Sequence, residues 1–162
     1  MFTPALLALA ETVLNEARAK GVRIATAESC TGGLIAGLLT EIAGSSDVFE
    51  RGFVTYSNKA KKDLLGVPGT LITRDGAVSE SVACAMAEGA LARADAEIAV
   101  AVTGVAGPGG GTPEKPVGLV HIAAVRSGRT AVHEIHRFGD IGRQDVRLKT
   151  VEAALLLLRK LL

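Results

Sequence analysis

The sequence predicts an α/β fold whose mixed sheet is mostly parallel. Three apolar runs with the character of strands are separated by helical patterns, and strands joined through helices usually lie parallel. Two further strand patterns flank Ser127-Gly128, a two-residue hairpin signal, so part of the sheet is antiparallel. The chain has 162 residues and shows neither an internal repeat nor a linker, so we expect a single domain over residues 1–162.

The first third of the chain is expected to form a helix, a strand and a second helix. Thr3-Pro4 is a typical helix start, and apolar residues recur at helical spacing over Met1–Lys20. The alternating run Val22–Ala27 is the first strand. It passes through small polar residues and glycines into a helix over residues 32–40.

The middle of the chain repeats this alternation. Gly52–Tyr56 is rich in strand-forming residues, and Asn58–Leu65 is a short helical pattern that ends at a glycine. Residues 66–78 are expected to form a loop. A long alanine-rich helix follows over Ser79–Ala94, capped by its serine. The uninterrupted apolar run Ile98–Val102 is typical of a strand that is buried on both faces.

The last third begins with a glycine-rich loop and ends with a helix. Thr103–Pro113 contains no helical pattern and matches neither a Walker A loop nor a dinucleotide fingerprint, which argues against a nucleoside-triphosphate enzyme. Val117–Val125 and Thr130–Phe138 are the hairpin strands, and Asp140–Leu162 is the closing helix. The apolar part of this helix, Val151–Leu162, either closes the core or forms part of a subunit contact, so a homo-oligomer is one expectation.

The order of the elements brings candidate chemistry to one edge of the sheet. The glycine-rich loop should reverse the chain, which makes the fourth strand antiparallel and the fifth strand parallel to the first three. In open α/β sheets, ligands bind outside the carboxyl ends of the strands. The residues delivered to this edge are Ser29, Tyr56 with Lys61, Thr103-Gly104 and the segment Asp140–Arg147.

Composition argues against several classes of partner. Hydrophobic residues make up 48% of the chain and aromatic residues 3%, so aliphatic side chains must build the core. The net charge of +1 and the lack of basic blocks interleaved with aromatic residues argue against a nucleic-acid partner. Cys30 and Cys84 fit neither a disulfide framework nor a metal site, and they suit a reduced, cytoplasmic setting. The apolar runs Ala5–Ala10 and Ala153–Leu158 indicate neither a cleaved leader nor a bilayer span, so no membrane partner is expected.

Ser29 is a candidate nucleophile at the turn that follows the first strand. In this position the backbone N–H groups of Cys30 and Thr31 would hold a negatively charged oxygen. A serine needs a neighbouring base, and from spacing alone a helix N-cap is the simpler role for Ser29. The Cys30 thiol is an alternative nucleophile, although a small packed cysteine is the usual case.

A lysine is a better candidate for the base than a histidine. His121, His133 and His136 all lie in the hairpin, and the last two are three residues apart on one strand, which places them on opposite faces. Lys59 and Lys61 follow the second strand, at the edge of the sheet where the carboxyl ends of the strands meet. A lysine can act as a base when burial lowers its pKa. The spacing does not choose between the two lysines, and a solvated helix start explains both equally well.

Two arginines near the start of the closing helix indicate an anion. Arg143 and Arg147 are four residues apart, so they are neighbours on one helix face close to its positive end. A phosphate or carboxylate between them would offset their repulsion. Pairing with Asp140 or Asp145 explains them equally well.

Several long segments match a known family in the right order. They are Thr26–Gly33, Ile42–Ser46, Phe49–Asn58 with Lys61, Gly76–Ser79, Thr103–Pro108 and Lys115–Gly118. On these segments, which span nearly the whole chain, the sequence resembles the CinA C-terminal domain family, whose enzymatically assigned members are nicotinamide mononucleotide amidohydrolases. Many members carry an additional N-terminal nucleotide-processing domain that this sequence lacks, so the resemblance leads us to expect a stand-alone amidohydrolase.

The resemblance implies a three-layer α/β/α sandwich and a serine–lysine mechanism. By position, Ser29 is the nucleophile, Lys61 is the base and Tyr56 belongs to the catalytic site. The residues implied for substrate binding are Thr103, Gly104, Arg143, Gln144 and Arg147, with the phosphate on one of the two arginines. The expected reaction converts nicotinamide mononucleotide, a small-molecule nucleotide, to nicotinic acid mononucleotide and ammonia without a metal or organic cofactor. The alternatives are hydrolysis of another amide and a non-catalytic nucleotide-binding or regulatory module.

Overall fold

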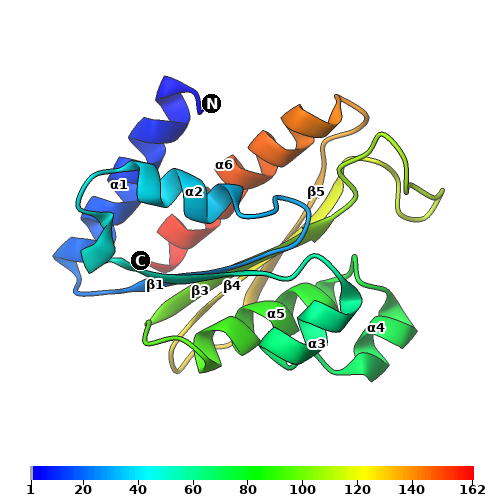
Figure 1. Cartoon of the computed structure of the whole chain (residues 1–162), viewed down its shortest axis with the longest axis horizontal. Coiled ribbons are helices and arrows are strands. Elements are labelled where there is room, and N and C mark those ends of the chain that lie inside the picture. The colour runs from blue at the N-terminus through cyan, green and yellow to red at the C-terminus, as the bar shows by residue number, and fades with distance from the viewer. Residues whose placement is uncertain (1) are drawn as a thin grey trace.

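The computed structural model of the chain describes residues 2–162 and contains one five-stranded sheet between two layers of helices (Figure 1). The strands are β1 Ile24–Glu28, β2 Phe49–Val54, β3 Ile98–Gly104, β4 Leu119–Arg126 and β5 Val132–Arg137. The helices are α1 Pro4–Ala19, α2 Leu34–Glu41, α3 Asn58–Leu65, α4 Gly69–Asp75, α5 Glu80–Ala92 and α6 Arg143–Leu161, with a 3-10 turn η1 at Ser45–Asp47. The fold is the three-layer α/β/α sandwich that the resemblance implies.

The sheet has the strand directions that the element order predicts. Its strand order is β2-β1-β3-β4-β5. Strand β1 pairs in parallel with β2 and β3, whereas β4 is antiparallel to both β3 and β5. Four of the five strands therefore point the same way, and only β4 runs against them.

The helices divide between the two faces of the sheet (Figure 1). Helices α1, α2 and α6 cover one face, and α6 packs on β3 and β4. Helices α3, α4 and α5 cover the other face, where α5 packs across β1, β3 and β4. None of the helices within residues 2–162 combines the length and the apolar character needed to cross a bilayer.

The two faces of the central strands carry side chains of different size. Large aliphatic residues such as Ile24 and Val100 face α1 and α6. Alanines face α5 instead: Ala25, Ala27, Ala99, Ala101 and Ala123. Because strand side chains alternate, the next positions on the alanine side after β1 and within β3 are Ser29 and Thr103. The small alanine side chains allow α5 to pack close to the sheet. At the carboxyl ends of β1 and β3, this row of small residues continues into the hydroxyl side chains of Ser29 and Thr103.

Several predicted boundaries are wrong: for example, helix α6 begins at Arg143 and not at Asp140. Three of the differences have a clear local reason. Helix α2 begins at Leu34 because Gly32 and Gly33 have φ values of +61° and +99°, outside the helical region. Strand β2 begins at Phe49, three residues before the predicted start; it is an edge strand whose mixed polar sequence lacks the expected alternation. Residues 66–78 contain helix α4, which buries none of its residues fully and so has no apolar stripe to reveal it.

Candidate active site

A cavity of about 320 Å³ opens where β1, β2 and β3 end. The predicted site residues that line it are Ser29, Cys30, Tyr56, Lys61, Thr103, Gly104 and Arg143. Gln144 and Arg147 line a neighbouring cavity of about 440 Å³ instead, and Arg143 borders both. Thr31 is fully buried within the turn that follows β1 and does not line this cavity. The structure therefore brings together residues from the turn after β1, from β3, α3 and α6, and from the connection between β2 and α3.

Lys61 reaches the Ser29 hydroxyl from helix α3. The helix begins after Ser57, whose Oγ accepts a hydrogen bond from the N–H of Ala60 at 3.0 Å. One turn in, the Nζ of Lys61 donates to Ser29 Oγ and to the carbonyl oxygen of Thr55, both at 3.0 Å. Lys61 is 1% exposed, whereas Lys59 forms an exposed ion pair with Asp63. The geometry distinguishes the two lysines that the sequence leaves equivalent.

The surroundings of Lys61 favour its neutral form. Burial lowers the pKa of Lys61 from the ordinary value of 10.5, because removal from water penalises the charged amine. Within residues 2–162, no carboxylate forms an ion pair with this amine. A neutral amine at hydrogen-bond distance from a serine hydroxyl can accept its proton.

The carboxylate of Glu28, rather than Ser29, caps helix α2. Its oxygens accept hydrogen bonds from the Thr31 hydroxyl at 2.5 Å and from the N–H groups of Gly33, Ile35 and Ala36 at 3.1, 3.0 and 2.8 Å. The N-cap interpretation of Ser29 is therefore wrong, because a neighbouring side chain satisfies the start of α2. The capping role of Glu28 is not visible in the sequence, which allows Glu28 either to orient a neighbouring group or to be simply a polar residue at a strand end.

The turn between Ser29 and Gly32 retains two free amides. It is closed by a hydrogen bond from the N–H of Gly32 to the carbonyl of Ser29 at 3.0 Å. No hydrogen bond in the described part of the chain uses the N–H of Cys30 or Thr31. Free backbone N–H groups beside a hydroxyl are suited to receive a negatively charged oxygen.

The Cys30 thiol is poorly suited to act as a nucleophile. It belongs to the apolar cluster that the sheet forms with α1, α2 and α6, and it is 5% exposed. Burial raises the pKa of Cys30 to about 12, so its thiolate is scarce near neutral pH.

Arg143 bridges three parts of the cavity mouth. Its guanidinium group donates to the carbonyl of Gly107 at 2.8 Å and to the Tyr56 hydroxyl at 3.1 Å. Neither Arg143 nor Arg147 forms an ion pair within residues 2–162, so the proposed pairing with Asp140 or Asp145 is wrong. Arg147 instead donates to the carbonyl oxygens of Cys30 at 3.2 Å and Thr31 at 2.8 Å.

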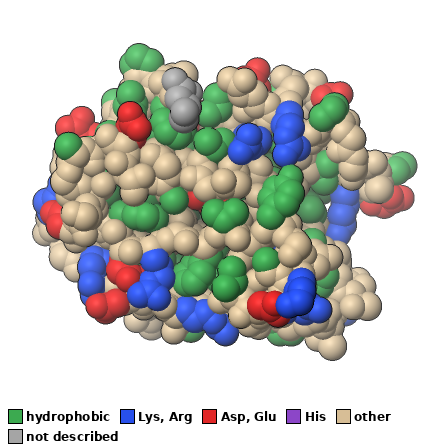
Figure 2. Space-filling model, in the orientation of Figure 1, with side chains coloured by type: hydrophobic (Ala, Val, Ile, Leu, Met, Phe, Trp, Pro, Cys, Tyr) green, Lys and Arg blue, Asp and Glu red, His purple; other side chains and the backbone are tan. Residues whose placement is uncertain are grey.

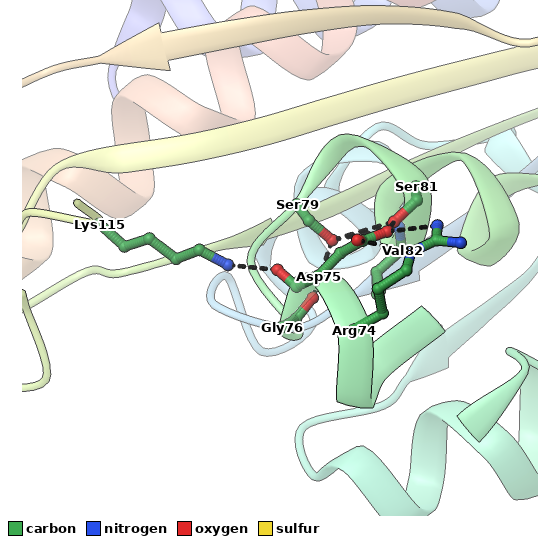
Figure 3. Close-up of polar contacts among 7 residues, drawn as sticks. All are labelled: Arg74, Asp75, Gly76, Ser79, Ser81, Val82 and Lys115. Carbon is green, nitrogen blue, oxygen red and sulfur yellow. Dashed lines mark hydrogen bonds and ion pairs between the residues drawn. The ribbon is translucent and has the colours of Figure 1, made fainter. Parts of the chain in front are cut away.

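Hydrogen bonds from Thr103 in β3 and from Lys115 hold the wall of the cavity formed by the turn between α4 and α5. Thr103 Oγ1 donates to the carbonyl of Ala77 at 2.9 Å. Just after the glycine-rich loop, Lys115 donates to the carbonyl of Asp75 at 2.5 Å, and the Ser81 hydroxyl donates to the Asp75 carboxylate (Figure 3). These contacts fix the turn between α4 and α5, which contributes Ala77 and Val78 to the cavity. A Cβ atom at Gly104 would lie 2.8 Å from the Leu119 carbonyl, so close strand packing explains this glycine.

The three histidines lie away from the cavity. His121 and His133 contact one another on the α5 face at 2.8 Å between Nδ1 and Nε2, and His136 contacts Glu134. Burial lowers the pKa of His121 to about 4. Among residues 2–162, no group of three metal-ligating side chains is arranged to hold an ion. On the face shown in Figure 2, acidic and basic side chains of the described residues are interspersed.

A model of the CinA C-terminal domain matches residues 6–162. The chain belongs to the CinA C-terminal domain family. It is 53% identical over 154 residues to a CinA-like protein of Syntrophobacter fumaroxidans, a match that covers 95% of this chain and 36% of the relative. It is also 55% identical over 131 residues to a CinA-like protein of Akkermansia muciniphila, with coverages of 80% and 32%. The chain thus spans about a third of the length of these curated relatives.

Solved structures of CinA-type proteins have the same fold. The competence/damage inducible protein CihA from Agrobacterium tumefaciens has a TM-score of 0.97 and 54% identity, over 99% of this chain and 98% of that one. A competence-damaged protein (CinA) superfamily protein from Escherichia coli has a TM-score of 0.92 and 34% identity, with coverages of 100% and 94%. The family and the fold are therefore established together.

Several other residues that line the cavity are not predicted by the sequence. Asn58 lines the cavity as the first residue of α3, directly after the capping serine. Ala77 and Val78 contribute from the turn before α5, and Gly109 and Gly110 from the glycine-rich loop. Asn58 stands within a segment that resembles the family, which is a signal that could have marked it. The apolar and glycine residues carry no chemical signal of their own.

Proposed function

We propose that this chain hydrolyses the carboxamide of nicotinamide mononucleotide to nicotinic acid mononucleotide and ammonia. The observation that carries the proposal is the buried amine of Lys61, 3.0 Å from Ser29 Oγ at the floor of an open cavity. Membership of the CinA C-terminal domain family supports the choice of substrate through the resemblance described above. The geometry itself supports the coarser class, acyl transfer by a serine and a lysine.

In the first half of the proposed reaction, Ser29 Oγ attacks the carboxamide carbon while Lys61 Nζ takes the hydroxyl proton. The free N–H groups of Cys30 and Thr31 receive the oxyanion. As the carbon–nitrogen bond breaks, the Lys61 ammonium returns its proton to the departing nitrogen, which leaves as ammonia. An acyl-enzyme on Ser29 remains.

In the second half, water attacks the acyl-enzyme. Lys61 removes a proton from the water and returns it to Ser29 Oγ when the ester bond breaks. The product is the carboxylic acid, and both side chains regain their initial protonation states. No step needs a redox partner, because only protons and an acyl group are transferred.

Arg143 is the proposed phosphate ligand. It lines the cavity that holds Ser29, carries no acidic partner among the described residues and already has one donor on Tyr56. A guanidinium group binds phosphate with two parallel hydrogen bonds, so it would fix the nucleotide with its amide toward Ser29. In this proposal, Tyr56, Thr103 and Gly104 shape the pocket, and Gln144 borders the neighbouring cavity.

The test is ammonia release from nicotinamide mononucleotide by purified protein. We expect Ser29→Ala and Lys61→Met each to abolish release, and Lys59→Met, which removes an exposed lysine from the same helix, to retain it. Activity in Ser29→Ala would point to the Cys30 thiol, and activity in Lys61→Met would remove the proposed base. Folding of each variant is checked by circular dichroism.

The names of the solved relatives support one alternative. Those structures are described as competence- or damage-related proteins, which would suit a module that binds a nucleotide without turnover. Binding of nicotinamide mononucleotide without ammonia release by the wild-type protein would favour this alternative. Ammonia from other carboxamides only would favour a different amide substrate.

A further inference from the structure

We infer that Arg147 is a positioning residue for the turn that carries Ser29, and is not a ligand of the substrate phosphate. The inference rests on the proposed function, since it assigns a role in the same reaction. Arg147 and Arg143 are four residues apart on α6, yet they contact different parts of the site. Arg143 faces the Ser29 cavity, whereas Arg147 approaches the turn from outside that cavity.

The contacts of Arg147 are with the backbone immediately after the nucleophile. Its Nε donates to the Cys30 carbonyl at 3.2 Å and its Nη2 to the Thr31 carbonyl at 2.8 Å. These carbonyls belong to consecutive peptide units of the turn between Ser29 and Gly32. The side chain is half-buried, and a Cβ atom at Gly32 would lie 3.4 Å from Nη2, so the guanidinium packs directly on the turn.

These contacts fix the direction of the free amides. In a trans peptide unit the carbonyl and the next N–H point in opposite directions. The Cys30 carbonyl points to Arg147, so the N–H of Thr31 points away from it. The Ser29 carbonyl is held by the N–H of Gly32, and this fixes the N–H of Cys30 in the same way. Hydrogen bonds to the carbonyls of Ser29 and Cys30 therefore fix the directions of the free N–H groups of Cys30 and Thr31.

Without Arg147, the peptide unit between Cys30 and Thr31 could adopt the opposite orientation. The two common β-turn types differ by a reversal of the peptide between their central residues, here Cys30 and Thr31. Reversal would exchange the Thr31 amide for a carbonyl, which repels an oxyanion. The β-branched Thr31 disfavours the reversed form, and Arg147 supplies the hydrogen bonds that hold the observed one. Its positive charge also polarises the bonded peptide and strengthens the N–H donor.

A second group holds the same turn from its other end. The buried Glu28 carboxylate accepts a hydrogen bond from the Thr31 hydroxyl and from three amides at the start of α2. Glu28 thus binds donors, and Arg147 binds acceptors. Neither Glu28 nor Arg147 bonds to the N–H groups of Cys30 and Thr31, which stay free.

The experiment measures kcat and KM for nicotinamide mononucleotide in Arg147→Ala and Arg147→Lys. The matched control is Arg159→Ala, which removes an exposed arginine of the same helix that pairs with Glu16. Loss of one oxyanion donor typically lowers kcat by a factor of about 100 to 1,000. We expect a loss of about 10- to 100-fold in kcat for Arg147→Ala, because the amides remain but their orientation is no longer fixed. KM should stay within about threefold of wild type, since phosphate binding is retained by Arg143.

Chemical rescue separates this role from general stabilisation. Ethylguanidinium at millimolar concentration should restore part of the kcat of Arg147→Ala and leave Arg159→Ala unchanged. A KM that rises while kcat is unchanged would overturn the inference and make Arg147 a phosphate ligand. An unchanged kcat in Arg147→Ala would also overturn it. If Arg147→Ala does not fold, Arg147→Lys decides, because a lysine cannot hold both carbonyls in the geometry of the guanidinium.

A second readout does not depend on the substrate. An alkyl fluorophosphonate labels an activated serine: Ser29 Oγ forms the phosphorus–oxygen bond, fluoride leaves and Lys61 takes the proton. Intact mass spectrometry should show at least tenfold slower labelling in Arg147→Ala than in wild type. If wild type is labelled but releases no ammonia from the nucleotide, the proposed substrate fails and the labelling ratio alone decides the role of Arg147. If wild type is not labelled and releases no ammonia, both proposals fail.

Discussion

Lys61 is the largest side chain among those that residues 2–162 bury almost completely. An amine in this position loses its hydration and gains only two neutral acceptors, Ser29 Oγ and the Thr55 carbonyl. The charged form is therefore costly, and the pKa of Lys61 is lowered by burial. A side chain that lowers the stability of the fold in this way is typical of a functional site.

The cost of burying Lys61 should be visible in the pH dependence of stability. The folded state releases the Lys61 proton at a lower pH than the unfolded state, whose value is near 10.5. Between these two values the unfolded state binds more protons, so the free energy of unfolding rises with pH. We expect Lys61→Met, which removes the charge, to be more stable than wild type near neutral pH. The difference should shrink as the pH approaches 10.5.

Urea unfolding of both proteins between neutral pH and pH 10 measures this difference. Its slope is at most about 1.4 kcal/mol for each pH unit, the value for one proton. Lys59→Met controls for the loss of a lysine from the same helix. A difference between wild type and Lys61→Met that does not change with pH would contradict the lowered pKa.

At the scale of single residues, the sequence predicts which residues belong to the candidate site better than it predicts what each of them contacts. Ser29 and the two lysines follow strand ends, and that much is readable from the order of elements. The choice of Lys61 over Lys59 depends on which side of α3 faces the sheet, and a helix of eight residues is too short to show this by its apolar pattern. The roles of Glu28 and Arg147 depend on contacts with backbone groups, which have no sequence signature.

At the scale of elements, one glycine controls how closely α3 approaches the alanine-rich helix. Gly89 lies on α5, and a Cβ atom there would lie 2.0 Å from the carbonyl oxygen of Leu65, the last residue of α3. Helix α3 carries Lys61, so the distance between the two helices also sets the position of the proposed base. In the sequence, Gly89 is recognisable only as a residue of low helix propensity within a helical pattern.

Gly89→Ala should therefore damage both stability and the site. Overpacking of this kind typically costs about 1–3 kcal/mol, and the displaced α3 should move Lys61 away from Ser29. The matched control is Gly37→Ala in α2, where the nearest atom would lie 3.9 Å away, an ordinary contact. That change should stabilise the protein by about 0.5–1 kcal/mol through helix propensity. Thermal unfolding and fluorophosphonate labelling of Ser29 measure the two effects; normal labelling in a destabilised Gly89→Ala would contradict the displacement of α3.

The order and direction of the elements could be predicted because they depend on local patterns and on connection rules. The antiparallel β4 follows from a glycine-rich loop without a helix, and the hairpin from Ser127-Gly128. Helix α4 could not be predicted, since it lies on the surface and has no buried face. The start of α2 could not be predicted because Gly32 and Gly33 adopt positive φ, which the sequence permits but does not require.

At the scale of the whole molecule, the cavity is the place where distant parts of the chain meet. Ser29, Lys61, Thr103 and Arg143 lie in four separate segments, and they line one cavity. The hydrogen bonds of Arg143 link α6 to Tyr56 and to the glycine-rich loop. A ligand that contacts all of these segments would be bound by the folded state alone, because unfolding separates them. A homo-oligomer remains a prediction, to be measured by the mass of the protein in solution.

Binding of the proposed substrate should therefore stabilise the entire fold. Ser29→Ala prevents turnover, and at a concentration of nicotinamide mononucleotide 100 times its Kd the free energy of unfolding should rise by about 2.7 kcal/mol. For a chain of 162 residues this corresponds to a rise in Tm of about 5–10 °C. Adding Arg143→Met should reduce the shift at the same concentration, because the phosphate loses its charged partner, whereas the exposed Lys149→Met should not. An unchanged Tm at millimolar nucleotide would mean that the cavity does not bind this molecule. A shift that survives Arg143→Met would mean that the phosphate is held elsewhere.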